Sequence, residues 1–355
     1  MDLHTLGWNG RLAKESESYA EAGLIPGRIC ADQRHHYAVL CEAGEYEAEV
    51  SGRFRAEAER KGDFPVVGDW VLLDLLPLEA KAIIKVLLPR ASSFSRRSAG
   101  EKTEEQVVAA NIDTAFIVTA ADGDFNPRRV ERYLALAWNS GAQPVVVINK
   151  VDLVNDPEEL VGQLRPSSVG APILAVSAEK ATGLEALLDH VGPGRTAVLL
   201  GSSGVGKSTI VNGLVGFTRQ ETRAVRADDN RGRHTTTTRE LIVLSTGGAI
   251  IDNPGMREVG LWGDEGGLED AFADIAALAS ECRFSDCRHE EEPGCAVRRA
   301  LEESRLDPDR FESYRKLGRE LRWIASREDE ALRAERKQFW KSIAKRQKSF
   351  RKDVR

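Results

Sequence analysis

Residues 201–209 carry the strongest chemical signal in the chain, a glycine-rich run of the form G-x-x-x-x-G-K-S-T. Residues 195–200 before it predict a short apolar strand, and residues 210–214 after it continue with helical spacing. A glycine loop between a strand and a helix can turn its amide groups around a phosphate, and its lysine and serine can reach phosphate oxygens and Mg²⁺. The expected nucleotide-binding residues here are Gly201, Ser202, Ser203, Gly204, Val205, Gly206, Lys207, Ser208 and Thr209.

A second motif, N-K-V-D, follows the strand predicted at residues 144–148. The carboxyl ends of parallel strands form the edge at which open α/β sheets bind ligands. A carboxylate there can accept hydrogen bonds from the N1–H and the exocyclic amine of guanine, which adenine does not offer. A loop after the next strand is placed to line the same base. The residues expected at the guanine are Asn149, Lys150, Val151, Asp152, Ser177 and Ala178.

Two later stretches suggest binding of Mg²⁺ and the γ-phosphate. Residues 232–238 read Gly-Arg-His-Thr-Thr-Thr-Thr, and one threonine there could ligate Mg²⁺ in the triphosphate state; the sequence does not say which, and we choose Thr236. Asp252 ends a predicted strand and precedes Asn-Pro-Gly, so its carboxylate could hold Mg²⁺ through water while the amide of Gly255 faces the γ-phosphate. The expected magnesium residues are Ser208, Thr236 and Asp252.

Three cysteines and a histidine lie within fourteen residues, in the pattern C-x₄-C-x-H-x₅-C. Three thiolates and one imidazole make a closed tetrahedral set with no open position for catalysis, as in structural zinc sites. The segment is acidic and rich in turns, with little apolar mass to bury unligated thiols. We therefore expect one structural Zn²⁺, bound by Cys282, Cys287, His289 and Cys295.

Together, the nucleotide motifs resemble the five signature motifs of translation-factor-type GTPases, but their order differs. The phosphate loop ordinarily comes first, whereas here N-K-V-D precedes it, so the chain looks like a circularly permuted GTPase. After Asp-Asn-Pro-Gly, where many GTPases place a glutamine that orients water, this chain has Met256. The resemblance therefore suggests His234 as the residue that positions the attacking water.

The elements that must position these motifs alternate between strand and helix. Strands are expected at residues 112–119, 144–148, 173–176, 195–200 and 249–251, with helices near 127–139, 157–164 and 184–190. Strands made of unbroken runs of Val, Ile and Leu are typical of a parallel sheet with helices on both faces. We assign residues 106–264 to this P-loop GTPase domain. Residues 265–332 are assigned to a zinc-knuckle helical domain, with helices at 297–301 and 310–324.

Five short strands predicted between residues 27 and 90 fit an OB-type β-barrel, so the fold class is multi-domain α/β. Cations such as Arg28 and Arg53 could contact an oligonucleotide there, but small barrels also serve as packing modules, and the residues alone favour neither. Residues 1–26 are an N-terminal segment to which we assign no function. The Ser/Arg-rich residues 91–105 are expected to be a linker.

In composition the chain is a globular protein, 41% apolar, with no apolar run long enough to span a membrane and a polar start without a signal-peptide core. We expect a cytoplasmic location and no membrane partner. The net charge of −6 conceals a basic tail, residues 333–355, with ten Lys or Arg and two acidic residues. Its interleaved aromatic residues would suit RNA, and a solvated amphipathic helix explains them equally well.

The order barrel, permuted GTPase, zinc knuckle and basic tail resembles the RsgA (YjeQ) family of ribosome small-subunit-dependent GTPases, over residues 27 to 332. Its most specific parts are the permuted order, the Gly-Arg-His-Thr-Thr-Thr stretch and the knuckle. The resemblance implies a GTP hydrolase that binds the immature small ribosomal subunit and its rRNA, is stimulated by that subunit and acts late in its assembly. We expect a monomer that uses Mg²⁺ with GTP and carries one Zn²⁺.

Two other functions remain open on the sequence. An ATP-dependent kinase would use the same phosphate loop, although N-K-V-D disfavours adenine. An RNA-binding module with negligible turnover would keep the nucleotide as a structural ligand. Turnover of GTP and of ATP, with and without ribosomal subunits, separates these possibilities.

Overall fold

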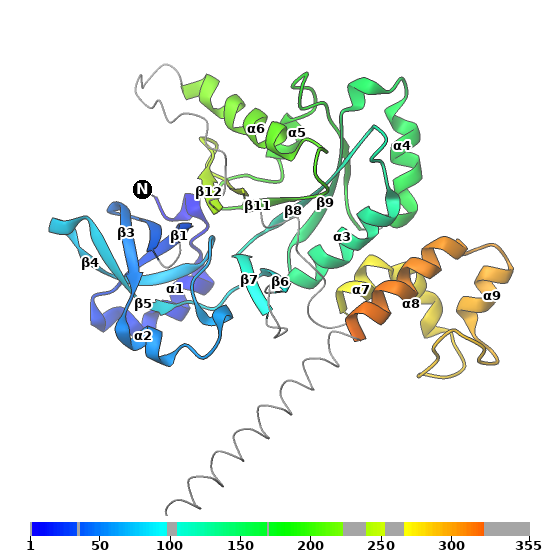
Figure 1. Cartoon of the computed structure of the whole chain (residues 1–355), viewed down its shortest axis with the longest axis horizontal. Coiled ribbons are helices and arrows are strands. Elements are labelled where there is room, and N and C mark those ends of the chain that lie inside the picture. Colours follow the sequence, from blue (N-terminus) through cyan, green and yellow to red (C-terminus); the bar gives the residue numbers. More distant parts are fainter. Residues whose placement is uncertain are drawn as a thin grey trace, which may run out of the picture.

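The computed structural model describes residues 2–33, 36–97, 105–168, 170–222, 239–252 and 266–322. Its centre is a sheet in the order β10-β9-β8-β11-β13-β12 (Figure 1). The first five of these strands run parallel, and the last is antiparallel to its neighbour. Their bounds are β8 (Thr114–Ala120), β9 (Gln143–Asn149), β10 (Ile173–Ala175), β11 (Thr196–Leu200), β12 (Arg239–Val243) and β13 (Ala249–Asp252).

Helices cover both faces of this sheet, which confirms the predicted fold class. On one face α3 (Pro127–Ser140) and α4 (Pro157–Leu164) bury apolar residues at helical spacing, such as Val130 and Leu134. On the other face α5 (Glu185–Leu188) and α6 (Lys207–Thr222) bury Leu187, Ile210 and Leu214 in a second core. Short 3₁₀ turns, η5 (Val151–Leu153) and η6 (Arg165–Ser167), lie between these elements. Strand β12 is an addition to the sequence prediction, which placed no strand there.

The first strands close into a barrel in the order β1-β2-β3-β5-β4, with β4 pairing back to β1. This is the predicted OB-type barrel, and its interior holds apolar side chains such as Ile29, Val71 and Ile84. Residues 52–57 and two 3₁₀ turns connect its strands. The bounds are β1 (Ile25–Gln33), β2 (His36–Cys41), β3 (Gly44–Val50), α2 (Gly52–Glu57), η3 (Lys61–Asp63), β4 (Trp70–Leu76), η4 (Pro77–Glu79) and β5 (Lys81–Leu87).

Both stretches flanking the barrel have more structure than the sequence indicated. The N-terminal segment forms η1 (His4–Leu6), α1 (Gly10–Ser16) and η2 (Glu17–Ala22), and its Leu6 and Leu12 pack on Trp70 of the barrel. Within the expected linker, β6 (Ser93–Arg97) pairs antiparallel with β7 (Glu105–Ala110). Periodicity did not reveal β6 because only Phe94 among its residues is a large apolar side chain.

The barrel and the GTPase sheet are continuous through β1 and β12, where Ala31 pairs with Glu240. The fully buried Arg28 reinforces this junction by donating hydrogen bonds to the carbonyls of Leu6, Gly68 and Asn111. Burial lowers the pKa of Arg28 to about 10, so the guanidinium stays charged at neutral pH. Arg28, which the sequence suggested as an oligonucleotide contact, is therefore a buried structural residue.

A helical unit lies against α3 on the side away from the barrel (Figure 1). It consists of α7 (Gly266–Ala271), α8 (Ala273–Ser280), α9 (Ala296–Glu302) and a helix over residues 308–322. Its Leu268 and Phe272 share one core with α3. The domain limits predicted near residues 265 and 333, and the basic tail 333–355, lie outside the described residues. Among the described residues, no helix combines the length and apolar character needed to cross a bilayer.

Candidate functional site

The glycine-rich loop connects β11, which is fully buried, to the start of α6. Two of its glycines are required by close approach: a Cβ at Gly201 would lie 2.3 Å from the carbonyl oxygen of Val118, and one at Gly206 would lie 2.2 Å from Asn149 Nδ2. The ammonium of Lys207 donates to the carbonyls of Gly201, at 2.7 Å, and Ser202, at 2.6 Å. Its charge therefore lies against the loop, where it can meet an anion.

Asn149, at the end of β9, joins the predicted base motif to the phosphate loop. Its buried amide donates to the carbonyl of Val205 at 2.9 Å and accepts from the amide of Ala178 at 3.0 Å. The hydroxyl of Ser177 donates to the carboxylate of Asp152 and fixes its orientation. The fold thus brings the three separate motifs, around residues 149, 177 and 205, to one edge of the sheet, as the sequence predicted for parallel strands.

The loop after β8, residues 121–126, was missed by sequence reasoning although it touches both halves of this site. Asp122 accepts a hydrogen bond from the Lys150 ammonium at 2.8 Å, and that bond holds the pKa of Asp122 below its usual range. Asp124 contacts Ser202 of the phosphate loop. An Asp-Gly-Asp sequence one residue after a buried parallel strand was the available signal, because it falls at the ligand-binding edge.

The magnesium residues are only partly described. Ser208 lies in the first turn of α6, and Asp252 ends β13, the strand beside β11. That arrangement places a hydroxyl and a carboxylate, oxygen ligands that suit Mg²⁺, at the same sheet edge. Strand β12, which pairs with β13 at Glu240 and Asp252, begins directly after residues 223–238. His234, Thr235, Thr236, Thr237 and Gly255 lie outside the described residues.

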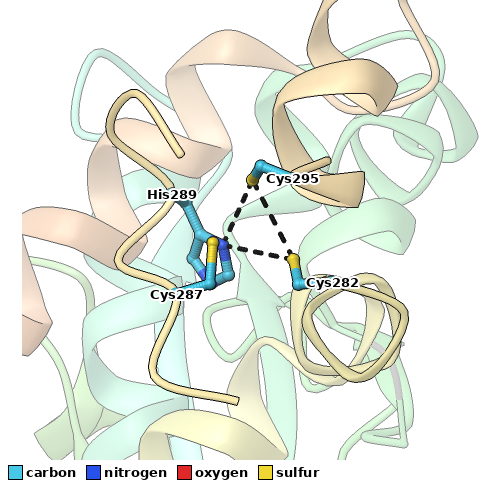
Figure 2. A group of neighbouring side chains, drawn as sticks. All are labelled: Cys282, Cys287, His289 and Cys295. Atoms are coloured by element: carbon cyan, nitrogen blue, oxygen red, sulfur yellow. Dashed lines mark hydrogen bonds between the residues drawn. The ribbon is translucent and has the colours of Figure 1, made fainter. Parts of the chain in front are cut away.

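The four predicted metal ligands converge between α8 and α9 (Figure 2). Their candidate ligand atoms all lie within 4.8 Å of one another. The Sγ atoms of Cys282 and Cys295 are 3.9 Å apart, and His289 Nδ1 is 3.6 and 3.5 Å from them. Bonds of ~2.3 Å at tetrahedral angles would place two sulfurs about 3.8 Å apart. The cluster therefore fits one tetrahedral metal ion.

The backbone around the cluster is shaped for this convergence. Cys295 caps α9, and the amide of Ala296 donates to Cys282 Sγ at 3.4 Å. Burial disfavours the thiolate of Cys282, but backbone amides and the neighbouring thiols outweigh it and lower the pKa of Cys282. Glu292 accepts hydrogen bonds from the amides of residues 288, 290 and 291, which lowers the pKa of Glu292 to about 2 and fixes the loop that carries His289.

The fold and these motifs define a class of protein. A phosphate loop, a guanine-type N-K-V-D motif and a parallel sheet with helices on both faces are the features of a P-loop GTPase. The N-K-V-D strand β9 lies beside β8 and precedes the phosphate loop in the chain, so the motif order is circularly permuted.

Comparison with known proteins identifies the family. The model of the RsgA GTPase family matches residues 87–262. The chain is 44% identical over 358 residues to the small ribosomal subunit biogenesis GTPase RsgA of Opitutus terrae, with 98% of each chain covered. Accordingly, the chain belongs to the RsgA GTPase family, and it is a GTPase.

Two solved structures share the fold. YjeQ from Thermotoga maritima gives a TM-score of 0.64 at 27% identity, covering 84% of this chain and 98% of that one. YloQ, described as a circularly permuted GTPase, gives a TM-score of 0.61 at 23% identity, covering 86% and 96%. The permuted fold predicted from motif order is therefore confirmed.

Proposed function

We propose that this protein hydrolyses GTP during late maturation of the small ribosomal subunit and that the subunit stimulates the reaction. The observation that carries the proposal is the similarity over 98% of both chains to a relative named for small-subunit biogenesis. The match includes the barrel and the metal cluster as well as the GTPase sheet, so it supports a shared role of the whole chain. We also propose a cytoplasmic monomer.

Within the site, Asp152 would accept hydrogen bonds from guanine, with Ser177 orienting its carboxylate. Lys207 and the amides of the glycine loop would hold the phosphates. Asn149 would keep the base and phosphate segments in register, because it bonds to both. The proposed GTP-binding residues are those named from the sequence, together with Asp252 and Gly255.

Ser208, Asp252 and Thr236 are proposed to hold Mg²⁺, which would neutralise charge on the phosphates. His234 is proposed to position the attacking water, since Met256 has no group that can do so. His234→Ala should leave nucleotide affinity nearly unchanged and lower turnover ~100-fold, a typical contribution of a group that assists proton transfer. Unchanged turnover would make His234 an ordinary loop residue.

The metal is proposed to be a single structural Zn²⁺, because Cys₃His donors and the sulfur spacing suit zinc and leave no open coordination position. Purified protein should contain one equivalent of zinc by elemental analysis. Cys295→Ser should lose it and loosen α8 and α9, measured by hydrogen exchange, while Cys41→Ser, buried in the barrel, should keep it. Zinc retained in Cys295→Ser would contradict the assignment.

Small-subunit rRNA is proposed as the partner of the barrel, the metal-bearing unit and the tail. Since the net charge of the chain is −6, local basic patches rather than the overall charge must attract RNA. Binding to the subunit should therefore weaken steeply with salt.

The deciding experiment measures GTP and ATP turnover with purified small subunits, with large subunits and with neither. We expect GTP turnover to rise only with small subunits and ATP turnover to stay at background. Asp152→Asn should weaken GTP binding by about 100-fold, because one of the two carboxylate oxygens that accept from guanine becomes an NH2 group, which opposes a guanine N–H donor. If GTP turnover were the same with and without small subunits, the proposed role would be refuted, although the GTPase activity itself would stand.

A further inference from the structure

Three side chains form a closed set of hydrogen bonds beside the phosphate loop. The carboxylate of Asp124 accepts from Arg129 at 2.6 Å and from the hydroxyl of Ser202. The same Arg129 nitrogen lies 2.9 Å from the Ser202 hydroxyl. Ser202 is the second residue of the glycine-rich loop, and its carbonyl also accepts from Lys207. Asp124 and Arg129 thus hold the first turn of the loop from outside it.

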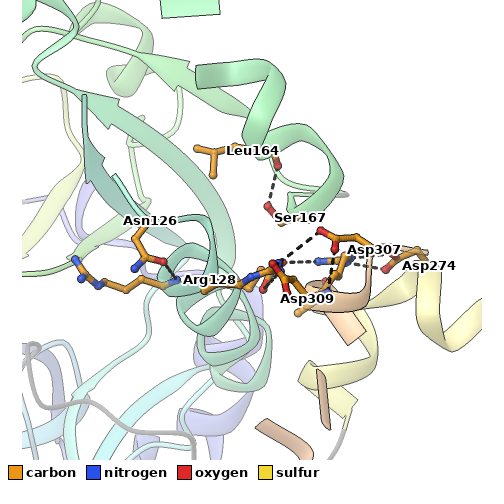
Figure 3. Close-up of polar contacts among 11 residues, drawn as sticks. Asn126, Arg128, Leu164, Ser167, Asp274, Asp307 and Asp309 are labelled. Atoms are coloured by element: carbon orange, nitrogen blue, oxygen red, sulfur yellow. Dashed lines mark hydrogen bonds and ion pairs between the residues drawn. The ribbon is translucent and has the colours of Figure 1, made fainter. Parts of the chain in front are cut away.

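The connection from β8 to α3 is built to present these two residues. The carboxylate of Asp122 accepts from the amide of Asp124 at 2.9 Å, which turns the loop toward Ser202. Asn126 caps α3 by accepting from the amide of Arg129 at 3.1 Å, which fixes the first helical turn (Figure 3). The backbone of Asp124 and the backbone of Arg129 are therefore each fixed by a hydrogen bond to a neighbouring side chain.

A carboxylate at this place raises an electrostatic problem. The loop must hold a nucleoside triphosphate with about four negative charges, and Asp124 lies one hydrogen bond away from it. Hydrogen bonds from Arg129 and Ser202 lower the pKa of Asp124, so the group is ionised at neutral pH. Without a cation beside it, the carboxylate would repel the phosphates, and the repulsion would grow with their charge.

We propose that Asp124 and Arg129 are positioning residues of the GTPase reaction. Together they fix Ser202 and the first turn of the phosphate loop, and Arg129 cancels the charge of Asp124 so that the loop accepts the triphosphate. The inference rests on the nucleotide site described above and adds a function to two residues outside its motifs. It also predicts that loss of Arg129 weakens the binding of GTP more than the binding of GDP.

The test measures dissociation constants for fluorescent GTP and GDP, with Mg²⁺, in four proteins: wild type, Arg129→Met, Asp124→Asn and the double variant. Arg129→Met should weaken GTP binding roughly fivefold more than GDP binding, the effect of one additional phosphate charge near a carboxylate that has lost its hydrogen-bonded cation, at an effective dielectric constant of ~40. The double variant should return the GTP/GDP ratio to that of wild type, and 0.5 M salt should shrink the effect.

Arg128→Met is the matched control. Arg128 precedes Arg129 on α3 but faces the helical unit, where it pairs with Asp307 and Asp309 (Figure 3), and it also pairs with Glu131 on its own helix. Arg128→Met should therefore leave the affinities for GTP and for GDP unchanged. The inference is overturned if Arg129→Met binds both nucleotides as wild type does, or weakens them equally without rescue in the double variant. A wild-type protein that bound no guanine nucleotide would instead refute the nucleotide site itself.

Discussion

The barrel joins the GTPase sheet mainly through main-chain hydrogen bonds, whereas the C-terminal helical unit joins α3 through charged side chains together with an apolar core. On the barrel side, β1 pairs with β12, Gly194 donates its amide to the carbonyl of Thr5, and the Arg28 guanidinium binds only carbonyl oxygens among its hydrogen-bond partners in the described chain. On the other side, ion pairs such as Glu131–Arg310 and Arg132–Glu320 join α3 to the helical unit in addition to a shared apolar core. Arg128 of α3 also pairs there with Asp307 and Asp309 (Figure 3). The barrel junction therefore depends on backbone shape, and the junction of the helical unit combines charge with apolar packing.

Each junction adjoins a different part of the nucleotide site. The barrel pairs with β12, which begins directly after residues 223–238, the stretch that contains the predicted threonines. The helical unit binds α3, whose first turn carries Arg129 beside the phosphate loop. A change at the barrel would therefore reach the strand that follows the predicted threonine stretch, and a change at the helical unit would reach the helix that carries Arg129.

Gly68→Ala should produce the largest loss, on the barrel side. Gly68 has φ +92°, and a Cβ there would lie 2.1 Å from the backbone carbonyl of Ala110, which cannot move without shifting β7. Backbone strain and overpacking together should lower the free energy of unfolding by about 4 kcal/mol. Gly44→Ala, with φ +127° but no atom within 4 Å, should lose only the strain, about 1 to 2 kcal/mol. Equal losses in urea unfolding would show that the junction tolerates the methyl group.

Arg310→Met should be the most damaging charge removal on the other side. Arg310 is 4% exposed and pairs with Asp274 at 2.7 Å and with Glu131, itself 1% exposed, at 3.1 Å. Removing it leaves a buried carboxylate with only Arg128 among its described charged partners, at a cost of about 3 kcal/mol.

Adding Glu131→Gln to Arg310→Met should recover part of that stability, because no buried charge is then left unbalanced. Arg315→Met, which breaks an exposed pair with Glu290, should cost little. Hydrogen exchange over residues 308–322 would show whether the loss is local to the helical unit. If the second substitution recovers nothing, apolar packing rather than charge holds this side.

The two junctions also separate what the sequence could predict from what it could not. Glycine loops, N-K-V-D and Cys₃His spacing are local patterns, and the strands that carry them alternate regularly, so the GTPase fold and most of its site were predictable. Arg28 looked like a surface cation because burial against three distant carbonyls leaves no local pattern. The contact of Asp124 with Ser202 was missed because its partner lies far along the chain, although the Asp-Gly-Asp sequence marked the loop. Strand β12 pairs with the nearby β13 as well as with the distant β1, but it is only five residues long and begins with two charged residues, so its apolar pattern is too short to predict a strand.

The smallest expected effect tests whether salt changes the stability of the two junctions differently. Arg132 and Glu320 form a bidentate pair, with distances of 2.7 and 2.8 Å, but their side chains are 37% and 30% exposed, so Arg132→Gln should cost only about 0.5 to 1 kcal/mol. Because solvent ions screen such a pair, that difference should fall toward zero in 1 M NaCl. The penalty of Gly68→Ala should not change with salt, since it arises from contact between uncharged atoms. A salt-dependent Gly68→Ala penalty, or a salt-independent Arg132→Gln loss, would mean that backbone shape and charge are not divided between the two junctions.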